Sequence, residues 1–196
     1  MRAFLVIALA TTACADSIAP DRPDAGALDS DATGVPSGPY RTTSHADGTF
    51  TTMLDATSTT DWLHVDFETD AAVDATAPWD LRFQRFHISA NGGVSGDGGV
   101  EVARLDGAAF ADVTSAPASG WTTDAADGDD ANTDPDYAFE QGDGWYAYDP
   151  TTHVLTPRPI VWVVRTNGSS TIKLELLRYY DDAGTAGWFT FRWAPL

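Results

Sequence analysis

The sequence predicts an all-β protein with a single antiparallel β domain, and three observations lead to this prediction. Seven Trp, nine Phe and six Tyr stand beside abundant Thr and Val, and these residue types are enriched in strands. Apolar and polar residues alternate along several short segments, whereas no long stretch has the i, i+3, i+4 spacing of a helix. Turn signals such as Asn167-Gly168 separate these segments. With 196 residues and 43% hydrophobic content, we expect one sizeable core and one folded domain.

The N-terminus has the features of an export signal. Met1-Arg2 precedes an apolar run over residues 3–10, which is too short to cross a bilayer. The only cysteine, Cys14, follows at the position where a bacterial lipoprotein signal places its lipid-bearing residue, although Thr11 replaces the usual Leu, Val or Ile. A structural thiol is the alternative, but a lone cysteine has no disulfide partner. We expect a signal peptide over residues 1–13 and an exported protein held to the outer membrane or cell surface of a bacterium by lipid on Cys14.

Residues 14–39 are predicted to form a disordered tether behind the lipidated cysteine. The segment has several prolines and glycines, few bulky apolar residues, and five aspartates. Such a composition cannot bury enough apolar surface to order the chain. A tail that binds a partner is the alternative interpretation. The folded β domain is then expected over residues 40–196.

The domain is predicted to open with a hairpin and a half-buried strand. Residues 40–60 suit a hairpin that turns at Asp47-Gly48. Residues 61–69 alternate, and residues 71–78 form a connection of small residues. The alternation places two sets of residues on opposite faces of the strand. One face carries Leu63, Val65 and Phe67, and the other carries Trp62, His64 and Asp66. We expect the first face to be buried and the second to be open.

The segment of residues 79–99 combines a strong strand pattern with a glycine-rich loop. Trp79, Leu81 and Phe83 fall on one side of an extended chain, whereas Phe86 and Ile88 fall on the other. This change of phase predicts a β-bulge near residues 84–85. The following Asn91-Gly92-Gly93 contains residues that tolerate positive φ, which favours a tight reversal.

The middle of the chain is predicted to be irregular and acidic. Residues 100–105 resume a strand pattern, and residues 106–118 suit a loop or a single helical turn. The segment of residues 121–135 and the residue after it carry six aspartates: Asp124, Asp127, Asp129, Asp130, Asp134 and Asp136. We interpret them as a solvated loop, with a calcium site as the alternative because carboxylates bind calcium. Their spacing does not match an EF-hand.

Aromatic residues gather after the acidic segment. The set surrounds Gly142-Asp143-Gly144 and contains Tyr137, Phe139, Trp145, Tyr146 and Tyr148. These residues suit either the strand faces of a hairpin or one wall of a pocket for a flat ligand. A turn follows at Asp149-Pro150, and the prolines of residues 156–159 are expected to prevent strand pairing until Ile160.

The C-terminus is predicted to form a three-stranded meander. Residues 160–165 are largely apolar, Asn167-Gly168 signals a hairpin, and residues 171–180 return with alternating apolar and polar positions. A second turn over residues 181–187 leads to a closing strand over residues 188–193. Turn chemistry and alternation agree along this whole segment.

Charge and motifs narrow the class of function. The formal net charge is -18, with 11 Lys plus Arg against 29 Asp plus Glu. Nucleic acid is therefore not an expected partner, because no basic stripe is available to neutralise phosphates. The sequence also has no GxSxG, HExxH or phosphate-loop motif. We expect a binding protein rather than an enzyme, with no catalytic residues.

Three blocks in this order resemble the HmuY-like haem-binding lipoprotein family. They are the WDLRF segment followed by NGG in residues 79–93, the VxVxRT strand of residues 161–166, and the GWFTFRW strand of residues 187–193. The resemblance extends from Trp62 to the C-terminus. It implies an all-β fold and non-catalytic capture of haem for iron acquisition, with an outer-membrane haem transporter as a partner.

The resemblance also implies iron ligands, and here the chain departs from the family. Relatives use a His pair or a Met pair from loops before the VxVxRT strand, whereas residues 106–159 contain His153 alone and no Met. His153 is the first candidate ligand, beside Tyr148 and before Arg158, which can pair with a haem propionate. The remaining candidates for a second ligand are His87, His64, His45 and Met53. Tyr146 and Tyr148 are candidate phenolate ligands.

Other interpretations of these residues stay open. His153 can be an exposed loop residue, His87 and His64 can be sheet residues, and His45 can be solvated. The same fold can serve as a surface module for another ligand after the loss of the haem ligands. It can also serve as an adhesive or scaffolding lipoprotein that contacts another protein through exposed Trp and Tyr.

Overall fold

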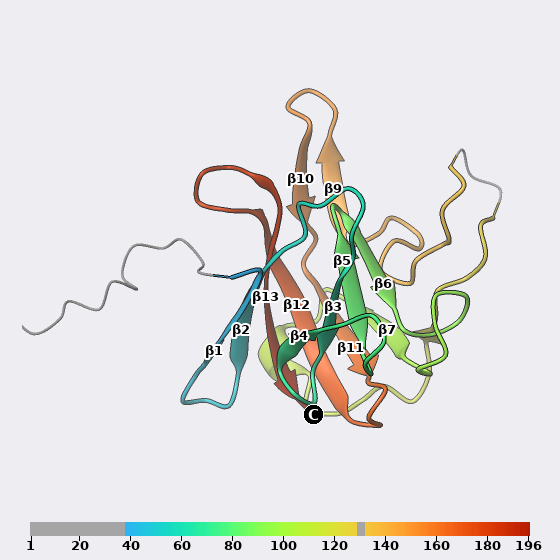
Figure 1. Ribbon diagram of the computed structural model, residues 1–196. Helices are drawn as coiled ribbons and strands as arrows, with labels where there is room; N and C mark the ends of the chain where they lie inside the picture. The colour runs from blue at the N-terminus through green and yellow to red at the C-terminus, as the bar shows by residue number, and fades with distance from the viewer. Residues whose placement is uncertain (1–37, 129–131) are drawn as a thin grey trace, which may run out of the picture. The chain divides into compact units, whose positions relative to one another are not determined.

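The computed structural model describes residues 38–128 and 132–196, and these residues form an all-β, antiparallel structure (Figure 1). The prediction of the fold class is therefore confirmed. The expected signal peptide, the lipidation of Cys14 and nearly all of the expected tether lie outside the described residues, as do Asp129 and Asp130 of the acidic segment.

The larger sheet has seven strands in the order β1-β2-β13-β12-β11-β7-β8. Its strands are β1 (Tyr40–Ser44), β2 (Phe50–Asp55), β7 (Glu101–Asp106), β8 (Trp121–Thr122), β11 (Ile160–Arg165), β12 (Thr171–Tyr180) and β13 (Ala186–Pro195). The C-terminal meander is confirmed, because β11, β12 and β13 are consecutive antiparallel neighbours. The opening hairpin is confirmed as well, since β1 pairs with β2 and Gly48 at the turn has a φ of 79°.

The smaller sheet has four strands in the order β4-β3-β5-β6. Its strands are β3 (Leu63–Asp66), β4 (Ala71–Val73), β5 (Leu81–Gln84) and β6 (His87–Ala90). It packs on the larger sheet through aromatic rings. The Phe83 ring of β5 lies 5.2 Å from the Phe189 ring and 5.8 Å from the Phe191 ring of β13 between centroids. These buried rings contribute much of the apolar area of the core.

The predicted bulge at residues 84–85 is wrong, because the chain reverses there. β5 and β6 form a hairpin in which Leu81 pairs with Ala90 and Phe83 pairs with Ile88. The reversal, rather than an extra residue, changes the phase of the apolar pattern. Arg85 adopts a φ of 53° at the turn, a conformation that is uncommon for a residue with a side chain.

The predicted tight reversal at residues 91–93 is a longer loop that leads from β6 to β7 of the other sheet. Asn91 organises this loop: its Nδ2 donates to the Trp79 carbonyl at 2.8 Å, and its Oδ1 accepts from Gly98 N at 3.0 Å. A Cβ on Gly96 or Gly98 would lie within 2.6 Å of the Asn91 side chain. The glycines are therefore needed for close approach.

The second face of β3 is covered, which contradicts the expectation of an open face. His64 is buried, and its ring lies 5.0 Å from the Trp79 ring in an edge arrangement. Asp66 is buried too, and its Oδ2 accepts a hydrogen bond from Thr69 Oγ1 at 2.7 Å. The alternation is real, but neighbouring segments cover both faces of the strand.

The expected loop or single helical turn after β7 is confirmed as η2 (Phe110–Asp112), a short 3₁₀ turn. It lies against the polar side of β12, where Lys173 Nζ donates to the carbonyls of Phe110 and Val113, both at 2.8 Å. This arrangement satisfies the carbonyl of the first residue of the turn and that of the residue after it. A second apolar cluster, separate from the main core, forms on this side of the sheet.

Asp124 is not the solvated loop residue that the acidic segment predicted. It is 1% exposed, and its carboxylate accepts hydrogen bonds from Ser89 Oγ at 2.8 Å, Ala90 N at 3.0 Å and Ala138 N at 2.8 Å. Burial raises the pKa of this carboxyl. Because both oxygens are occupied by protein donors, Asp124 holds the acidic segment to β6 and is not directed towards a solvated cation.

A further hairpin joins β9 (Tyr146–Asp149) to β10 (Val154–Pro157), at the top of the view in Figure 1. The expectation that prolines prevent pairing before Ile160 is wrong, because Pro157 ends β10 and is a register partner of Tyr146. A proline is tolerated at the end of a strand in a two-stranded sheet. The hairpin is fastened to β12, since Leu155 N donates to the Tyr180 hydroxyl at 3.0 Å.

Candidate functional site

The β9–β10 hairpin forms one wall of an open groove. Tyr146 and Tyr148 are two residues apart on β9 and therefore face the same side. They line a groove of about 360 Å³ together with Arg158 and the segment before β9. The complete lining is Glu140, Gly142, Asp143, Gly144, Tyr146, Tyr148 and Arg158. The volume falls in the range of roughly 300–1,000 Å³ that is typical of small-molecule sites.

Arg158 is held in place at one side of this groove. Its Nε donates to the carbonyls of Asp143 at 3.1 Å and Tyr146 at 3.0 Å, and its Nη1 lies 3.4 Å from Asp143 Oδ2. Arg104 also contacts Asp143, with 2.7 Å between Nη2 and Oδ1. The hydrogen bond from Arg104 lowers the pKa of Asp143, and the charge of Arg158 adds to this effect. The guanidinium of Arg158 is thus fixed by backbone and faces the groove.

Tyr148 and His153 contact each other across the hairpin turn. The hydroxyl of Tyr148 is hydrogen-bonded to His153 Nδ1, and the two ring centroids are 5.9 Å apart. Asp149 shapes the turn, because its carboxylate accepts from Thr151 N and Thr152 Oγ1, both at 2.8 Å. His153 itself has a φ of 58°, in the left-handed region that few non-glycine residues adopt. The turn therefore places the imidazole beside the phenol.

His87 lies in a neighbouring pocket and does not line the groove. Its Nδ1 is 3.0 Å from Glu140 Oε1, in a polar pocket of about 120 Å³. The rings of Phe86 and Tyr137 pack around it, with centroids 4.1 Å and 5.4 Å away. Glu140 lines both the pocket and the groove. The structure thus places Tyr148 and Arg158 along one groove, with His153 hydrogen-bonded to Tyr148, whereas His87 lies in the pocket on the other side of Glu140.

The other candidate ligands from the sequence lie elsewhere. His64 is buried against Trp79, and burial lowers its pKa, with the positive charge of Arg82 adding to the effect. His45 is exposed near the β1–β2 turn, where its Nε2 is 2.9 Å from Thr51 Oγ1. Met53 is half-buried within β2. None of these three lines the groove in the described part of the chain.

Sequence reasoning did not identify Glu140 and Asp143 as groove residues. The only signal for this loop was Gly142-Asp143-Gly144, in which both glycines have positive φ, 69° and 65°. These angles allow the tight turns that present Asp143 towards Arg104 and Arg158. Phe86 was also missed as a neighbour of the site. Its ring is 36% exposed and lies 6.1 Å from Tyr146, and its carbonyl accepts a hydrogen bond from the buried Trp145 indole at 3.0 Å.

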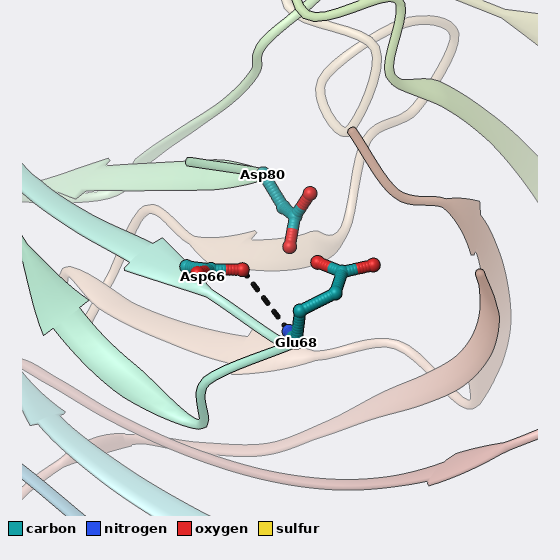
Figure 2. A group of neighbouring side chains, drawn as sticks. All are labelled: Asp66, Glu68 and Asp80. Carbon is teal, nitrogen blue, oxygen red and sulfur yellow. Dashed lines mark hydrogen bonds between the residues drawn. The ribbon is translucent and has the colours of Figure 1, made fainter. Parts of the chain in front are cut away.

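A second polar cluster consists of Asp66, Glu68 and Asp80, and it has the composition of a cation site (Figure 2). One oxygen from each residue lies within 4.8 Å of the others. Protein donors already occupy the fully buried member: Asp80 Oδ2 accepts from Phe67 N at 2.8 Å, and Oδ1 accepts from Asn167 N at 2.7 Å. Glu68 accepts a hydrogen bond from Thr166 Oγ1. The cluster therefore joins the β3–β4 turn to the β11–β12 turn.

Asp80 is the unusual member of this cluster, because its side chain is fully buried. Burial raises its pKa to about 7, and the nearby charges of Glu68 and Asp66 add to the increase. Protonation of Asp80 near neutral pH relieves the repulsion between these carboxylates. The cluster thus has a structural explanation that requires no cation.

The described residues thus form an all-β domain with an open, aromatic-walled groove on its surface. No helix in residues 38–128 or 132–196 is both long enough and apolar enough to span a membrane. The chain belongs to the HmuY family, because the family model described as HmuY protein matches residues 58–193. The resemblance inferred from the three sequence blocks is thus confirmed.

Several solved structures share this fold at low sequence identity. A candidate HmuY-like haem-binding protein from Bacteroides vulgatus is 17% identical with a TM-score of 0.61, covering 79% of this chain and 95% of its own. A candidate lipoprotein from Bacteroides fragilis is 22% identical with a TM-score of 0.59, covering 78% and 91% respectively. The apo form of an HmuY analogue from Tannerella forsythia is 17% identical with a TM-score of 0.57, covering 79% and 95%. A comparison with curated proteins found no match.

Proposed function

We propose that the protein binds haem, without catalysis, in the groove beside the β9–β10 hairpin. The observation that carries the proposal is that Tyr148 and Arg158 line one groove, with His153 hydrogen-bonded to Tyr148, in a member of the HmuY family. The similarity in fold to a candidate HmuY-like haem-binding protein supports the same ligand class.

The chemistry of the groove suits a flat ligand with acidic edges. The rings of Tyr146 and Tyr148 offer aromatic contact to a porphyrin. The fixed guanidinium of Arg158 offers charge-assisted hydrogen bonds to a propionate. The Tyr148–His153 pair offers oxygen and nitrogen donors for the iron, both of which are known ligand types for haem. His87 contacts Glu140, which lines both the groove and the neighbouring pocket.

The cellular role that we propose follows from the predicted N-terminus. A protein exported by residues 1–13 and lipidated at Cys14 stays on the outer membrane or cell surface, and a tether lets its domain meet ligands outside the cell. There it acquires haem iron and passes the haem to an outer-membrane transporter. No chemical conversion of the ligand is part of this role.

Titration of the purified full chain with haemin tests the proposal. We expect a saturable one-to-one shift of the Soret band, and we expect the Tyr148→Ala/His153→Ala double variant to lose at least 90% of that shift. His45→Ala is the matched control, because it removes an exposed histidine from the β1–β2 hairpin. A titration without saturation would instead favour the alternative, a surface module for another ligand.

A further inference from the structure

The groove beside the β9–β10 hairpin contains an arginine whose charge the protein uses only in part. Arg158 Nε donates to the carbonyls of Asp143 and Tyr146, and both of these residues line the groove. Arg158 Nη1 is 3.4 Å from Asp143 Oδ2, which is longer than the roughly 2.7–2.9 Å of a strong charge-assisted hydrogen bond. Among the described residues, Arg158 Nη2 has no protein partner. The backbone therefore fixes this guanidinium and leaves its Nη donors largely unused.

The carboxylate of Asp143 is the competitor for these donors. Its side chain is 60% exposed and also lines the groove. A carboxylate at this position can pair with Arg158, and its charge repels an anionic ligand. In the described part of the chain, Glu140 is the second acidic residue of the lining, and Arg158 is its single basic residue. The lining by itself therefore disfavours a ligand with a negative charge.

Arg104 of β7 changes this balance from outside the groove lining. Its Nη2 is 2.7 Å from Asp143 Oδ1, whereas Arg158 approaches the same carboxylate only to 3.4 Å. A Cβ on Gly142, which lines the groove, would lie 3.8 Å from Arg104 Nη1. Arg104 is itself held by Asp106, with 2.8 Å between Nε and Oδ1, and its side chain is 22% exposed. Arg104 thus pairs with Asp143 from a fixed position next to the groove.

We propose that Arg104 is a positioning residue that keeps Asp143 paired and thereby leaves Arg158 available to a carboxylate at the edge of the groove ligand. This inference rests on the proposed binding of haem, whose propionates are such carboxylates. The groove then selects flat ligands with an anionic edge over their neutral analogues. The lowered pKa of Asp143 agrees with this division of partners, because the hydrogen bond from Arg104 is its largest cause and the charge of Arg158 is a smaller one.

Titration of the full chain with haemin at low ionic strength tests this role. Arg104→Ala is expected to weaken haemin binding about three- to fivefold, because Asp143 then pairs with Arg158 and repels the propionates. The Arg104→Ala/Asp143→Asn double variant is expected to recover most of that loss, since the competing charge is gone. Arg178→Ala is the matched control with wild-type affinity, because it removes the same charge from an exposed ion pair with Asp182 that does not line the groove.

Haemin dimethyl ester, in which both propionates are esterified, separates an effect of charge from a loss of structure. The ester presents no carboxylate to Arg158. Wild type and Arg104→Ala are therefore expected to bind it with the same affinity in the same solvent. Equal weakening towards haemin and the ester would assign Arg104 a structural role and overturn the proposal.

Two further results would overturn the role of Arg104. One is an Arg104→Ala variant that binds haemin as tightly as wild type, and the other is a double variant that binds no better than Arg104→Ala. In both cases haemin still saturates the wild-type protein, so the proposed function stands and only the positioning role fails. If haemin does not saturate the wild type, the haem proposal itself fails and the inference fails with it.

Discussion

The carboxylate cluster and the hairpin groove both gather polar side chains, but they differ in what satisfies those side chains. In the cluster, the fully buried Asp80 accepts hydrogen bonds from Phe67 N and Asn167 N. In the groove, Tyr148 is 52% exposed, and among the described residues its hydroxyl is hydrogen-bonded to a second exposed side chain, that of His153. The cluster uses its polar atoms to hold the fold together, whereas the groove presents them to solvent.

Whether protein donors already satisfy a polar side chain distinguishes structural residues from candidate binding residues better than the type of residue does. Three carboxylates are the expected composition of a cation site, yet here backbone amides of two turns donate to the fully buried one, Asp80. A tyrosine and a histidine on a hairpin tip are common surface residues, yet they contact each other next to an aromatic groove. The comparison predicts that changes in the cluster alter stability and that changes in the groove alter binding.

The largest effect is expected from Asp80→Ala. The substitution leaves the amides of Phe67 and Asn167 without their acceptors, and each unsatisfied buried amide costs about 1–3 kcal/mol. At pH 5, where Asp80 is protonated in the folded protein, we expect the free energy of unfolding to fall by roughly 2–4 kcal/mol. Denaturant titration measures this change. Asp74→Ala, at an exposed position between β4 and β5, is the control, and an equal loss in both variants would contradict a special role for Asp80.

The next effect is the pH dependence of stability that Asp80 confers. Its folded pKa of about 7 lies above the ordinary value of 3.8, so the folded state holds the proton more tightly than the unfolded state. The stabilisation that Asp80 contributes is fully present at pH values below its ordinary pKa. It is lost as the pH rises through the folded pKa. Between pH 5 and pH 8 we expect a loss of about 2–3 kcal/mol.

Asp80→Asn tests this pH dependence without changing the size of the side chain. The amide cannot ionise, so the loss of unfolding free energy between pH 5 and pH 8 is expected to shrink by most of its wild-type value. Asp74→Asn is expected to keep the wild-type profile. A steep profile that persists in Asp80→Asn would assign the pH dependence to another group, and Asp124, whose pKa burial also raises, would be tested next.

The parts of the fold that the sequence predicts well are those with local causes. In the C-terminal meander, each strand alternates and each turn has its own glycine, so neighbouring residues determine the structure. The β5–β6 hairpin was misinterpreted as a bulged strand because Arg85-Phe86 contains none of the residues that usually mark a turn. The β9–β10 hairpin was missed because its prolines were interpreted as a barrier to pairing.

Long-range contacts explain the remaining differences. In the sequence, Asp124 looks like any other residue of an acidic loop. Its burial depends on hydrogen-bond donors that lie far from it in the sequence: Ser89, Ala90 and Ala138. Tyr148, His153 and Arg158 were all candidate residues from the sequence, whereas the contact between Tyr148 and His153 was not predicted. That contact depends on the β9–β10 hairpin and on the left-handed backbone of His153 in its turn, because the register partner of Tyr148 is Leu155.

The smallest change in the free energy of unfolding is expected from a substitution at the groove. Tyr148→Phe removes a hydroxyl whose only described partner is the exposed His153, so the free energy of unfolding should change by less than about 0.5 kcal/mol.

Tyr180→Phe is the matched control, because its hydroxyl accepts a hydrogen bond from Leu155 N and fastens the hairpin to β12. Loss of that acceptor should cost about 1 kcal/mol. Thermal melts of both variants measure the difference. If Tyr148→Phe proved as destabilising as Tyr180→Phe, the phenol of Tyr148 would serve the fold, and its exposure at the groove would no longer indicate a role in binding.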